Sequence, residues 1–330
     1  MKKIGVIGAG SWGTALALLL SNNKHQVTMW SIMEEEVKML QENYEHKDKL
    51  PGISLPKTIT FTTNLEAAVK DKDLLVLAVP SPFTRSTSKM MKEYVTQGQL
   101  IVNVAKGIEE NTMKTLSEII EEEIPQATVC VLSGPSHAEE VGRGLPTTCV
   151  IGAKEEKTAT YIQEIFMNKA FRVYTSDDIL GIELGGALKN VIALAAGVAD
   201  GLGYGDNIKA ALITRGISEI SRLGVAMGGR KETFGGLTGI GDLIVTCASM
   251  HSRNRRAGIL IGKGYTMEEA MAEVKMVVEG VHSAKAAVQL AEKYQVELPI
   301  IEQVYAVLFE GSLAKEAVDV LMGREKKSEL

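Results

Sequence analysis

The sequence has few aromatic residues and few cysteines, and each shortage narrows the class of protein. Aromatic residues make up 5% of the 330 positions and hydrophobic residues 45%, so we expect a mainly aliphatic core. The cysteines (Cys130, Cys149 and Cys247) are odd in number and widely spaced, which suggests reduced thiols in the cytoplasm. The five histidines form no H-E-x-x-H pattern and no Cys/His cluster. We therefore predict no metal.

Charge and hydropathy exclude further classes. The net charge of −5 argues against non-specific binding to nucleic acid, so any anionic ligand must be held by local charge. We see no internal repeat, no low-complexity tract and no apolar run of roughly 20 residues that would predict a membrane span. The length of 330 residues favours two domains.

The most informative stretch is the first twenty residues. Ile4–Ile7 reads as a short apolar strand, followed by GAGSWG and an apolar helix. This is G-x-G-x-x-G in the context that it needs, with a strand before and a helix after it. We expect Gly8 to make the turn, Gly10 to admit the pyrophosphate of a dinucleotide, and Gly13 to pack the helix against the strand. The N–H groups at the helix start would then face the phosphates.

A secretory signal peptide is the alternative interpretation of this stretch. Two lysines precede an apolar run from Ile4 to Leu20, as in a signal peptide. However, glycines at strand–turn–helix spacing are unusual in a signal core, and the polar turn Ser21–Lys24 offers no clear cleavage site. We therefore favour dinucleotide binding.

Strand and helix patterns alternate up to about residue 176, which predicts a doubly wound, mostly parallel Rossmann sheet in a domain of residues 1–178. The expected strands after the first are 26–30, 73–80, 100–104, 129–132, 147–151 and 171–175. In this fold an acidic residue near the end of the second strand binds the ribose of NAD, and an arginine accepts the 2′-phosphate of NADP. Here Ser31, Ile32 and Met33 follow that strand, and Glu34–Glu36 look like the first turn of a helix. The choice between NAD and NADP stays open on these residues.

Two further candidates follow the expected strands. Lys106 comes after the strand that ends at Val104, and ligands bind at the carboxyl ends of strands in such sheets. The alternative is a solvated loop lysine. Ser133–Ala138 forms a tight loop after another strand, with Gly134-Pro135 offering free backbone donors.

From Ile179 onward the pattern is helical, which predicts an all-helical domain of residues 179–330. Lys189 and Asn190 interrupt an apolar, glycine-rich helix, where close packing around a site would compensate for the weak helix propensity. Burial and a second cation such as Lys106 favour the neutral amine, so Lys189 could act as a base; the alternative is a lysine that snorkels to solvent.

Ser252 looks like the N-cap of a helix that carries Arg253 and Asn254 in its first turn. Cations there oppose the helix dipole unless an anion such as phosphate binds among them. The alternative is a solvent-facing basic patch. Together these features favour a nicotinamide enzyme that transfers a hydride between its cofactor and a small phosphorylated alcohol or ketone.

Several motifs together make the chain resemble the bacterial NAD(P)-dependent glycerol-3-phosphate dehydrogenases over nearly its full length. They are GAGSWGTALA near the start, AKG with Lys106, LSGPSHAEEV from Leu132, GGALKNVIALAAG around Lys189, GLGYGDN from Gly201, and GLTGIGDLIVTC followed by HSRNRRAG. The resemblance implies a Rossmann domain, a helical domain and interconversion of sn-glycerol 3-phosphate with dihydroxyacetone phosphate, mainly toward the former for phospholipid synthesis. It implies NAD or NADP as cofactor.

The resemblance also implies roles for particular residues. Lys189 matches the proton acceptor of the family. Residues that match substrate contacts are Lys106, Gly134, Ser136, Lys189, Asn190, Asp242, Thr246, Ser252, Arg253 and Asn254. Residues that match cofactor contacts, beyond the three glycines, are Ser11, Trp12, Lys106, Ala138, Arg253, Val277 and Glu279.

The sequence departs from the family at one place, because many bacterial members carry a basic pair where Ile32 and Met33 stand. We therefore expect NADH to be used at least comparably with NADPH. Other candidates are a β-hydroxyacid or 6-phosphogluconate-type dehydrogenase and a catalytically idle dinucleotide sensor. We expect a cytoplasmic enzyme with a small-molecule substrate and no nucleic-acid partner, and we expect it to form a homodimer.

Overall fold

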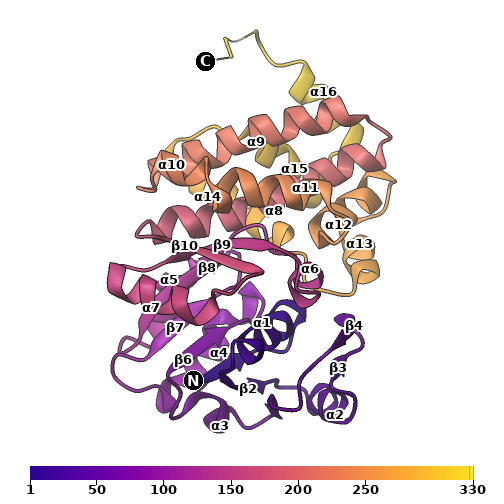
Figure 1. The fold of residues 1–330 in the computed structure, drawn as a ribbon. Coiled ribbons are helices and arrows are strands. Elements are labelled where there is room, and N and C mark those ends of the chain that lie inside the picture. The colour runs from indigo at the N-terminus through magenta and orange to yellow at the C-terminus, as the bar shows by residue number, and fades with distance from the viewer. Residues whose placement is uncertain (327, 330) are drawn as a thin grey trace. The chain divides into compact units, whose positions relative to one another are not determined.

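A computed structural model describes residues 1–326 and 328–329 of the chain. The chain divides into two compact units (Figure 1). Unit 1 comprises residues 1–106 and 114–183, and unit 2 comprises residues 107–113 and 184–330. The predicted domain division at residue 178 stays a prediction.

Unit 1 is built on an eight-stranded sheet in the order β10-β9-β8-β7-β6-β1-β2-β5. All neighbouring strands are parallel except β8 and β9. The strands are β1 (Lys3–Ile7), β2 (Gln26–Trp30), β5 (Thr60–Thr62), β6 (Leu74–Leu77), β7 (Leu100–Asn103), β8 (Thr128–Ser133), β9 (Thr147–Gly152) and β10 (Phe171–Ser176). This arrangement is a Rossmann-type sheet, with the glycine-rich turn leaving its interior strand β1.

Helices bury both faces of this sheet. Successive residues of a strand point to opposite faces, so Leu74 and Val76 belong to one apolar cluster and Leu75 and Leu77 to the other. The helices of unit 1 are α1 (Ser11–Asn22), α2 (Glu34–Asn43), α3 (Leu65–Val69), α4 (Thr84–Met91), α5 (Leu116–Glu123), α6 (Ala138–Gly142) and α7 (Glu156–Phe166). Helices α1 and α7 contribute to the first cluster, and α3, α4 and α5 to the second.

Among the described residues, the secondary-structure elements of unit 2 are all helices, joined by loops. Helix α8 (Ile179–Gly201) begins in unit 1 and continues into unit 2. The others are α9 (Asp206–Ala226), α10 (Lys231–Phe234), a π-helical turn (Leu237–Gly241), α11 (Asp242–Ala248), α12 (Arg253–Gly262), α13 (Met267–Val274), α14 (Glu279–Tyr294), α15 (Pro299–Phe309) and α16 (Ala314–Met322).

The glycines of α8 allow α12 to approach it very closely. A Cβ atom added to Gly197 would lie 2.1 Å from the carbonyl oxygen of Arg255, and one added to Gly258 would lie 2.2 Å from that of Leu194. Both distances are far inside van der Waals contact, so the helices touch through their backbones. Close packing is thus what offsets the low helix propensity of these glycines.

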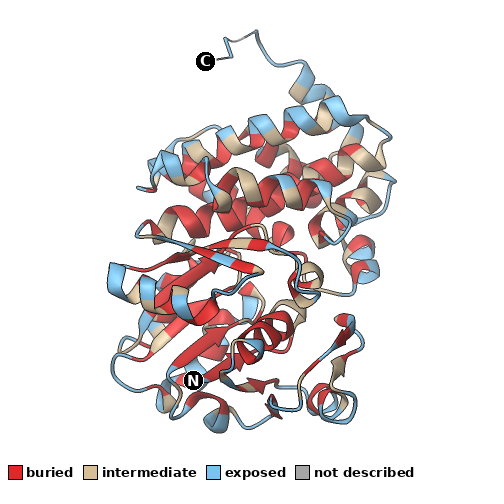
Figure 2. Cartoon of the chain, viewed as in Figure 1, coloured by how far each residue is buried: buried red, intermediate tan, exposed pale blue. Residues whose placement is uncertain are grey.

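Helix α8 also bears on the question of a membrane. Among the described residues it is long and apolar enough to cross one, and the bent pair 231–248 and 253–262 passes the same test when joined. The expectation that no such stretch exists is therefore wrong on length and composition. However, 83% of the apolar window of α8 is buried inside the structure, as in a core helix, and Figure 2 shows burial along most of its length.

The predicted fold class is confirmed, and several local predictions are corrected. From its residue type Asn207 would be predicted to cap the helix that follows, but α9 begins at Asp206 with Gly205 as its N-cap. The sequence analysis missed β5 and the two-stranded antiparallel sheet of β3 (Glu45–His46) and β4 (Leu50–Ser54). β3 and β5 have only two and three residues, too few for a period-2 pattern to be detected, and β4 contains Pro51 and Gly52, which are uncommon in strands.

We predict that Gly197→Ala destabilises the protein by about 2 kcal/mol, because the added methyl group must push α8 and α12 apart. At an exposed helix position the same change would stabilise by up to about 1 kcal/mol. Gly235→Ala is the control, since its Cβ would lie 3.5 Å from the nearest atom, an ordinary contact. Urea unfolding of both variants gives the answer. Equal stability of the two variants would contradict the close-packing explanation.

Candidate active site

The glycine-rich turn of unit 1 has a separate structural reason for each glycine. Gly8 has φ = 115° and donates its N–H to the carbonyl of Trp30 at 2.9 Å, which ties β1 to β2. A Cβ atom on Gly13 would lie 2.1 Å from the carbonyl oxygen of Gly8, so only glycine lets α1 pack this close. By contrast, a Cβ on Gly10 would meet nothing within 4 Å.

This open space beside Gly10 fits a dinucleotide. Gly10 is the N-cap of α1 and provides no side-chain cap, so the N–H groups of Ser11 and Trp12 begin the helix without one. The first turn holds no acidic residue that would compete for them. A pyrophosphate suits such a helix start, because the N–H groups and the helix dipole both favour an anion.

Lys106 follows β7 and reaches the loop after β8. Its Nζ donates to the carbonyl oxygen of Gly134 at 3.0 Å, and the hydroxyl of Ser136 donates to the same oxygen at 2.9 Å. Gly134 has φ = 143°, which a side chain would oppose. Ala138 begins α6 just beyond this loop. Three of the predicted site residues of unit 1 therefore meet at one carbonyl oxygen.

The sequence analysis missed a buried charged cluster beside the end of β2. Glu36 lies in the first turn of α2, as expected, but its side chain is 8% exposed and accepts hydrogen bonds from Ser31, His46 and Lys49. Burial alone would raise the pKa of Glu36, yet these three bonds lower it to about 2. Three consecutive glutamates give no signal of which one turns inward, so the sequence could not reveal it.

In unit 2, the structure brings Lys189, Asp242 and Thr246 together. The Nζ of Lys189 donates to Asp242 Oδ1 at 2.7 Å and to Thr246 Oγ1 at 2.6 Å. The side chains are almost completely buried, with 5%, 1% and 3% exposed for the three residues in that order. Helix α11 holds Asp242 and Thr246 on one face. The hydroxyl of Thr246 also donates to the backbone carbonyl of Asp242 at 2.6 Å. The π-helical turn directly precedes Asp242.

Asn190 connects this cluster to α12 and α14. The amide of Asn254 donates to Asn190 Oδ1 at 2.9 Å and accepts from the N–H of Gly280 at 2.8 Å. A Cβ on Gly280 would lie 2.5 Å from the Asn190 carbonyl oxygen, so this contact requires glycine. The start of α14, which carries Glu279 after Val277, is thereby fixed to α8.

Ser252 is the N-cap of α12, as predicted, and accepts a hydrogen bond from the N–H of Arg255 at 3.2 Å. Arg253 and Asn254 form the first turn with no acidic residue beside them. The neighbouring Arg255 is engaged elsewhere, because it binds Asp200 at 2.7 Å and the carbonyl of Ala248 at 2.7 Å. Arg253 is the first helical residue after the cap.

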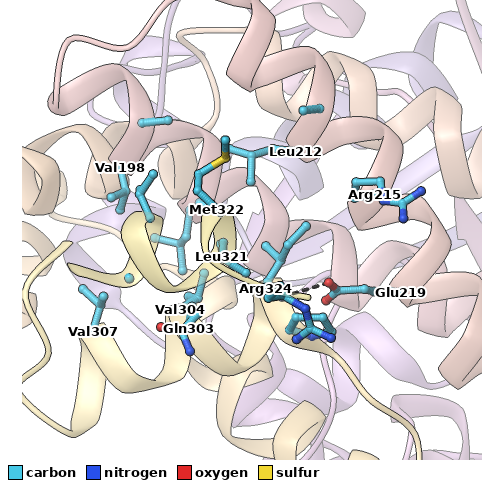
Figure 3. A pocket seen from close by; sticks show the side chains of 18 of the residues that line it. Val198, Leu212, Arg215, Glu219, Gln303, Val304, Val307, Leu321, Met322 and Arg324 are labelled. Carbon is cyan, nitrogen blue, oxygen red and sulfur yellow. Dashed lines mark hydrogen bonds between the residues drawn. The ribbon is translucent and has the colours of Figure 1, made fainter. Parts of the chain in front are cut away.

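No group of three or more His, Cys, Asp or Glu side chains suited to a metal ion occurs in the described residues. Unit 2 also contains an apolar cavity of about 810 Å³ lined from α8, α9, α15 and α16 (Figure 3). Figure 3 shows Val198, Leu212, Val304 and Leu321 around it, with Glu219 at its edge. The Lys189 cluster is not among its lining residues.

A mostly parallel sheet with a glycine-rich first turn, joined to a helical unit, is the architecture of NAD(P)-dependent dehydrogenases. Two family models match this chain. The model for the NAD-dependent glycerol-3-phosphate dehydrogenase N-terminus matches residues 3–159, and the model for the C-terminus matches residues 178–319. The chain belongs to the NAD-dependent glycerol-3-phosphate dehydrogenase family.

Individual relatives agree. A glycerol-3-phosphate dehydrogenase [NAD(P)+] from Agathobacter rectalis is 67% identical over 329 residues, covering 100% of this chain and 98% of the relative. One from Fusobacterium nucleatum is 63% identical and covers 100% of this chain and 99% of the relative. The crystal structure of glycerol-3-phosphate dehydrogenase from Coxiella burnetii has a TM-score of 0.94 at 36% identity, covering 98% of this chain and 99% of that one.

Glu219 gives a pH prediction for unit 2. Burial raises its pKa to about 7, although the N–H groups of Ile300 and Ile301 donate to it. The folded protein therefore binds more protons than the unfolded chain between about pH 4.5 and 7. Its contribution to stability is present at low pH and is lost as the pH rises toward 7.

We predict that Glu219→Gln gains stability relative to the unmodified protein as the pH rises from 5 to 8, by on the order of 3 kcal/mol. Urea unfolding at both pH values measures the difference. The exposed Glu310→Gln is the control and should show a difference that does not depend on pH. A pH-independent difference for Glu219→Gln as well would contradict the raised pKa.

Proposed function

We propose that this chain interconverts sn-glycerol 3-phosphate and dihydroxyacetone phosphate by hydride transfer with NAD(H) or NADP(H). The observation that carries the proposal is that family models of this dehydrogenase match both halves of the chain, one of which contains the buried Lys189–Asp242–Thr246 cluster. In the reducing direction a ketone, a hydride and a proton give a secondary alcohol. The protein must therefore bind the phosphate, orient the carbonyl and supply the proton.

Lys189 is the proton donor in this proposal, and the acceptor in the reverse direction. A buried ammonium group is costly unless it is paired, and Asp242 offsets that cost while fixing the position of Nζ. Thr246 accepts from the same Nζ and donates to the backbone of α11, so it orients the lysine without adding charge. When bound, the nicotinamide ring supplies or accepts the hydride. Lys189 then holds or releases the proton at the oxygen of the reacting carbonyl.

The phosphate of the substrate binds at the start of α12 in this proposal. Arg253 offers a charged planar fork and the helix start offers N–H groups, both suited to a phosphate. Asn254 and Asn190 are held to each other by a hydrogen bond, which makes them rigid polar contacts. The remaining proposed substrate contacts are Lys106, Gly134, Ser136, Asp242, Thr246 and Ser252.

The proposed cofactor contacts in unit 1 are the open helix start at Gly10, Ser11 and Trp12, together with Lys106 and Ala138. In unit 2 they are Arg253, Val277 and Glu279. No metal takes part in the proposed reaction. We further propose that the enzyme supplies glycerol 3-phosphate for phospholipid synthesis, that it acts in the cytoplasm as a homodimer, and that its domains divide at residue 178.

Absorbance of the reduced nicotinamide tests the function. We expect oxidation of NADH or NADPH that requires dihydroxyacetone phosphate and does not occur with unphosphorylated dihydroxyacetone. The latter lacks the phosphate group that the proposed site would bind. Protein shown to be folded but inactive with both cofactors would contradict the proposal. Activity on a β-hydroxyacid would then indicate the related dehydrogenases, and cofactor binding without any turnover would indicate a sensor.

A further inference from the structure

The Glu36 cluster lies at the position where Rossmann folds distinguish their cofactors. Ser31 directly follows β2, and the residues there contact the ribose 2′ position in this fold, with an acidic residue for NAD and an arginine for the 2′-phosphate of NADP. Here Ser31 is 4% exposed, and its hydroxyl donates to Glu36 and accepts from the N–H of Met33 at 3.2 Å. Glu36 is therefore one hydrogen bond away from the residue at that position.

The cations of this cluster are already paired with Glu36. Lys49 donates its Nζ to Glu36 Oε1, and His46 Nε2 lies 2.9 Å from the same oxygen. Both come from the small sheet of β3 and β4 and the turn within it. The residues between Ser31 and α2 are Ile32 and Met33, which carry no charge and are 69% and 53% exposed. A 2′-phosphate would thus meet a fixed carboxylate and a lysine whose charge is neutralised.

We propose that Glu36 sets the cofactor preference of this enzyme by neutralising Lys49, the lysine of this cluster, which would otherwise attract a 2′-phosphate. The inference rests on the proposed function, since it concerns the cofactor of that reaction. With its lysine paired, the cluster offers no net positive charge to the phosphate that only NADP carries, whereas the ribose hydroxyl of NAD needs none. The result is a site that binds NAD at least as tightly as NADP.

A purely structural role for Glu36 makes a different prediction. The cluster also attaches β3 and β4 to the start of α2, so loss of Glu36 could loosen this part of unit 1. Loosening would weaken both cofactors alike, because they share the whole nucleotide apart from the 2′-phosphate. The ratio of the two dissociation constants therefore distinguishes a role of Glu36 in cofactor selectivity from a purely structural role.

Calorimetric titration of the full-length protein with NAD+ and with NADP+ measures that ratio without any turnover. Glu36→Gln keeps the size and an acceptor oxygen and removes only the charge. We expect it to shift the ratio of the dissociation constants toward NADP+ by about tenfold. Glu35→Gln removes the same charge from an exposed neighbour in the same helical turn and should leave the ratio within about twofold.

A second variant tests the part played by Lys49. Glu36→Gln combined with Lys49→Met restores the net charge of the original cluster, so the ratio should return to about its original value. Lys49→Met alone leaves Glu36 uncompensated and should shift the ratio toward NAD+; this variant also serves if Glu36→Gln fails to fold. An unchanged ratio in Glu36→Gln, or equal weakening of both cofactors, would overturn the inference. Failure of the unmodified protein to bind either cofactor would instead contradict the proposed function.

Discussion

The buried ion pair between Lys189 and Asp242 is the contact on which the helical unit depends. Removing one partner would leave an uncompensated charge inside the protein, at a cost of about 3–5 kcal/mol. The residues next to this ion pair link it to the surrounding helices. Thr246 stands one turn after Asp242 on α11, and Asn190 follows Lys189 on α8 and reaches α12 through Asn254. The backbone contact between α8 and α12 at Gly197 and Gly258 keeps these two helices, and so Asn190 and Asn254, close together. Burying such a charged pair costs stability, which favours a functional role for Lys189 over the alternative of a lysine that snorkels to solvent.

Much of the architecture could be predicted from the sequence because its signals are local. The glycines at positions 8, 10 and 13 between an apolar strand and an apolar helix indicate a dinucleotide turn on chemical grounds alone. The apolar run that contains β6 has the composition of a strand buried on both faces, as the structure shows. Ser252 could be identified as a helix cap because capping depends on one residue and its neighbours.

The features that the sequence did not reveal arise from contacts between distant residues. Nothing in Glu34–Glu36 distinguishes the glutamate that turns inward, since its partners His46 and Lys49 come from another element. The glycines of α8 indicated close packing, but their partner α12 could be found only in three dimensions. Asn207 resembles a helix cap as strongly as Ser252 does, yet α9 begins at Asp206, with Gly205 as its N-cap, two residues before the position that a cap at Asn207 would give.

The central claim is that Lys189 transfers the proton, and Lys189→Met tests it most directly. We predict that turnover of dihydroxyacetone phosphate falls by at least about a thousandfold while NADH binding, measured by calorimetry, stays within a few-fold of normal. Lys209→Met is the matched control, because Lys209 also forms an ion pair in unit 2, with Asp200 at 2.8 Å. Its turnover should stay near normal. Near-normal turnover in Lys189→Met, in folded protein that binds cofactor, would contradict the claim.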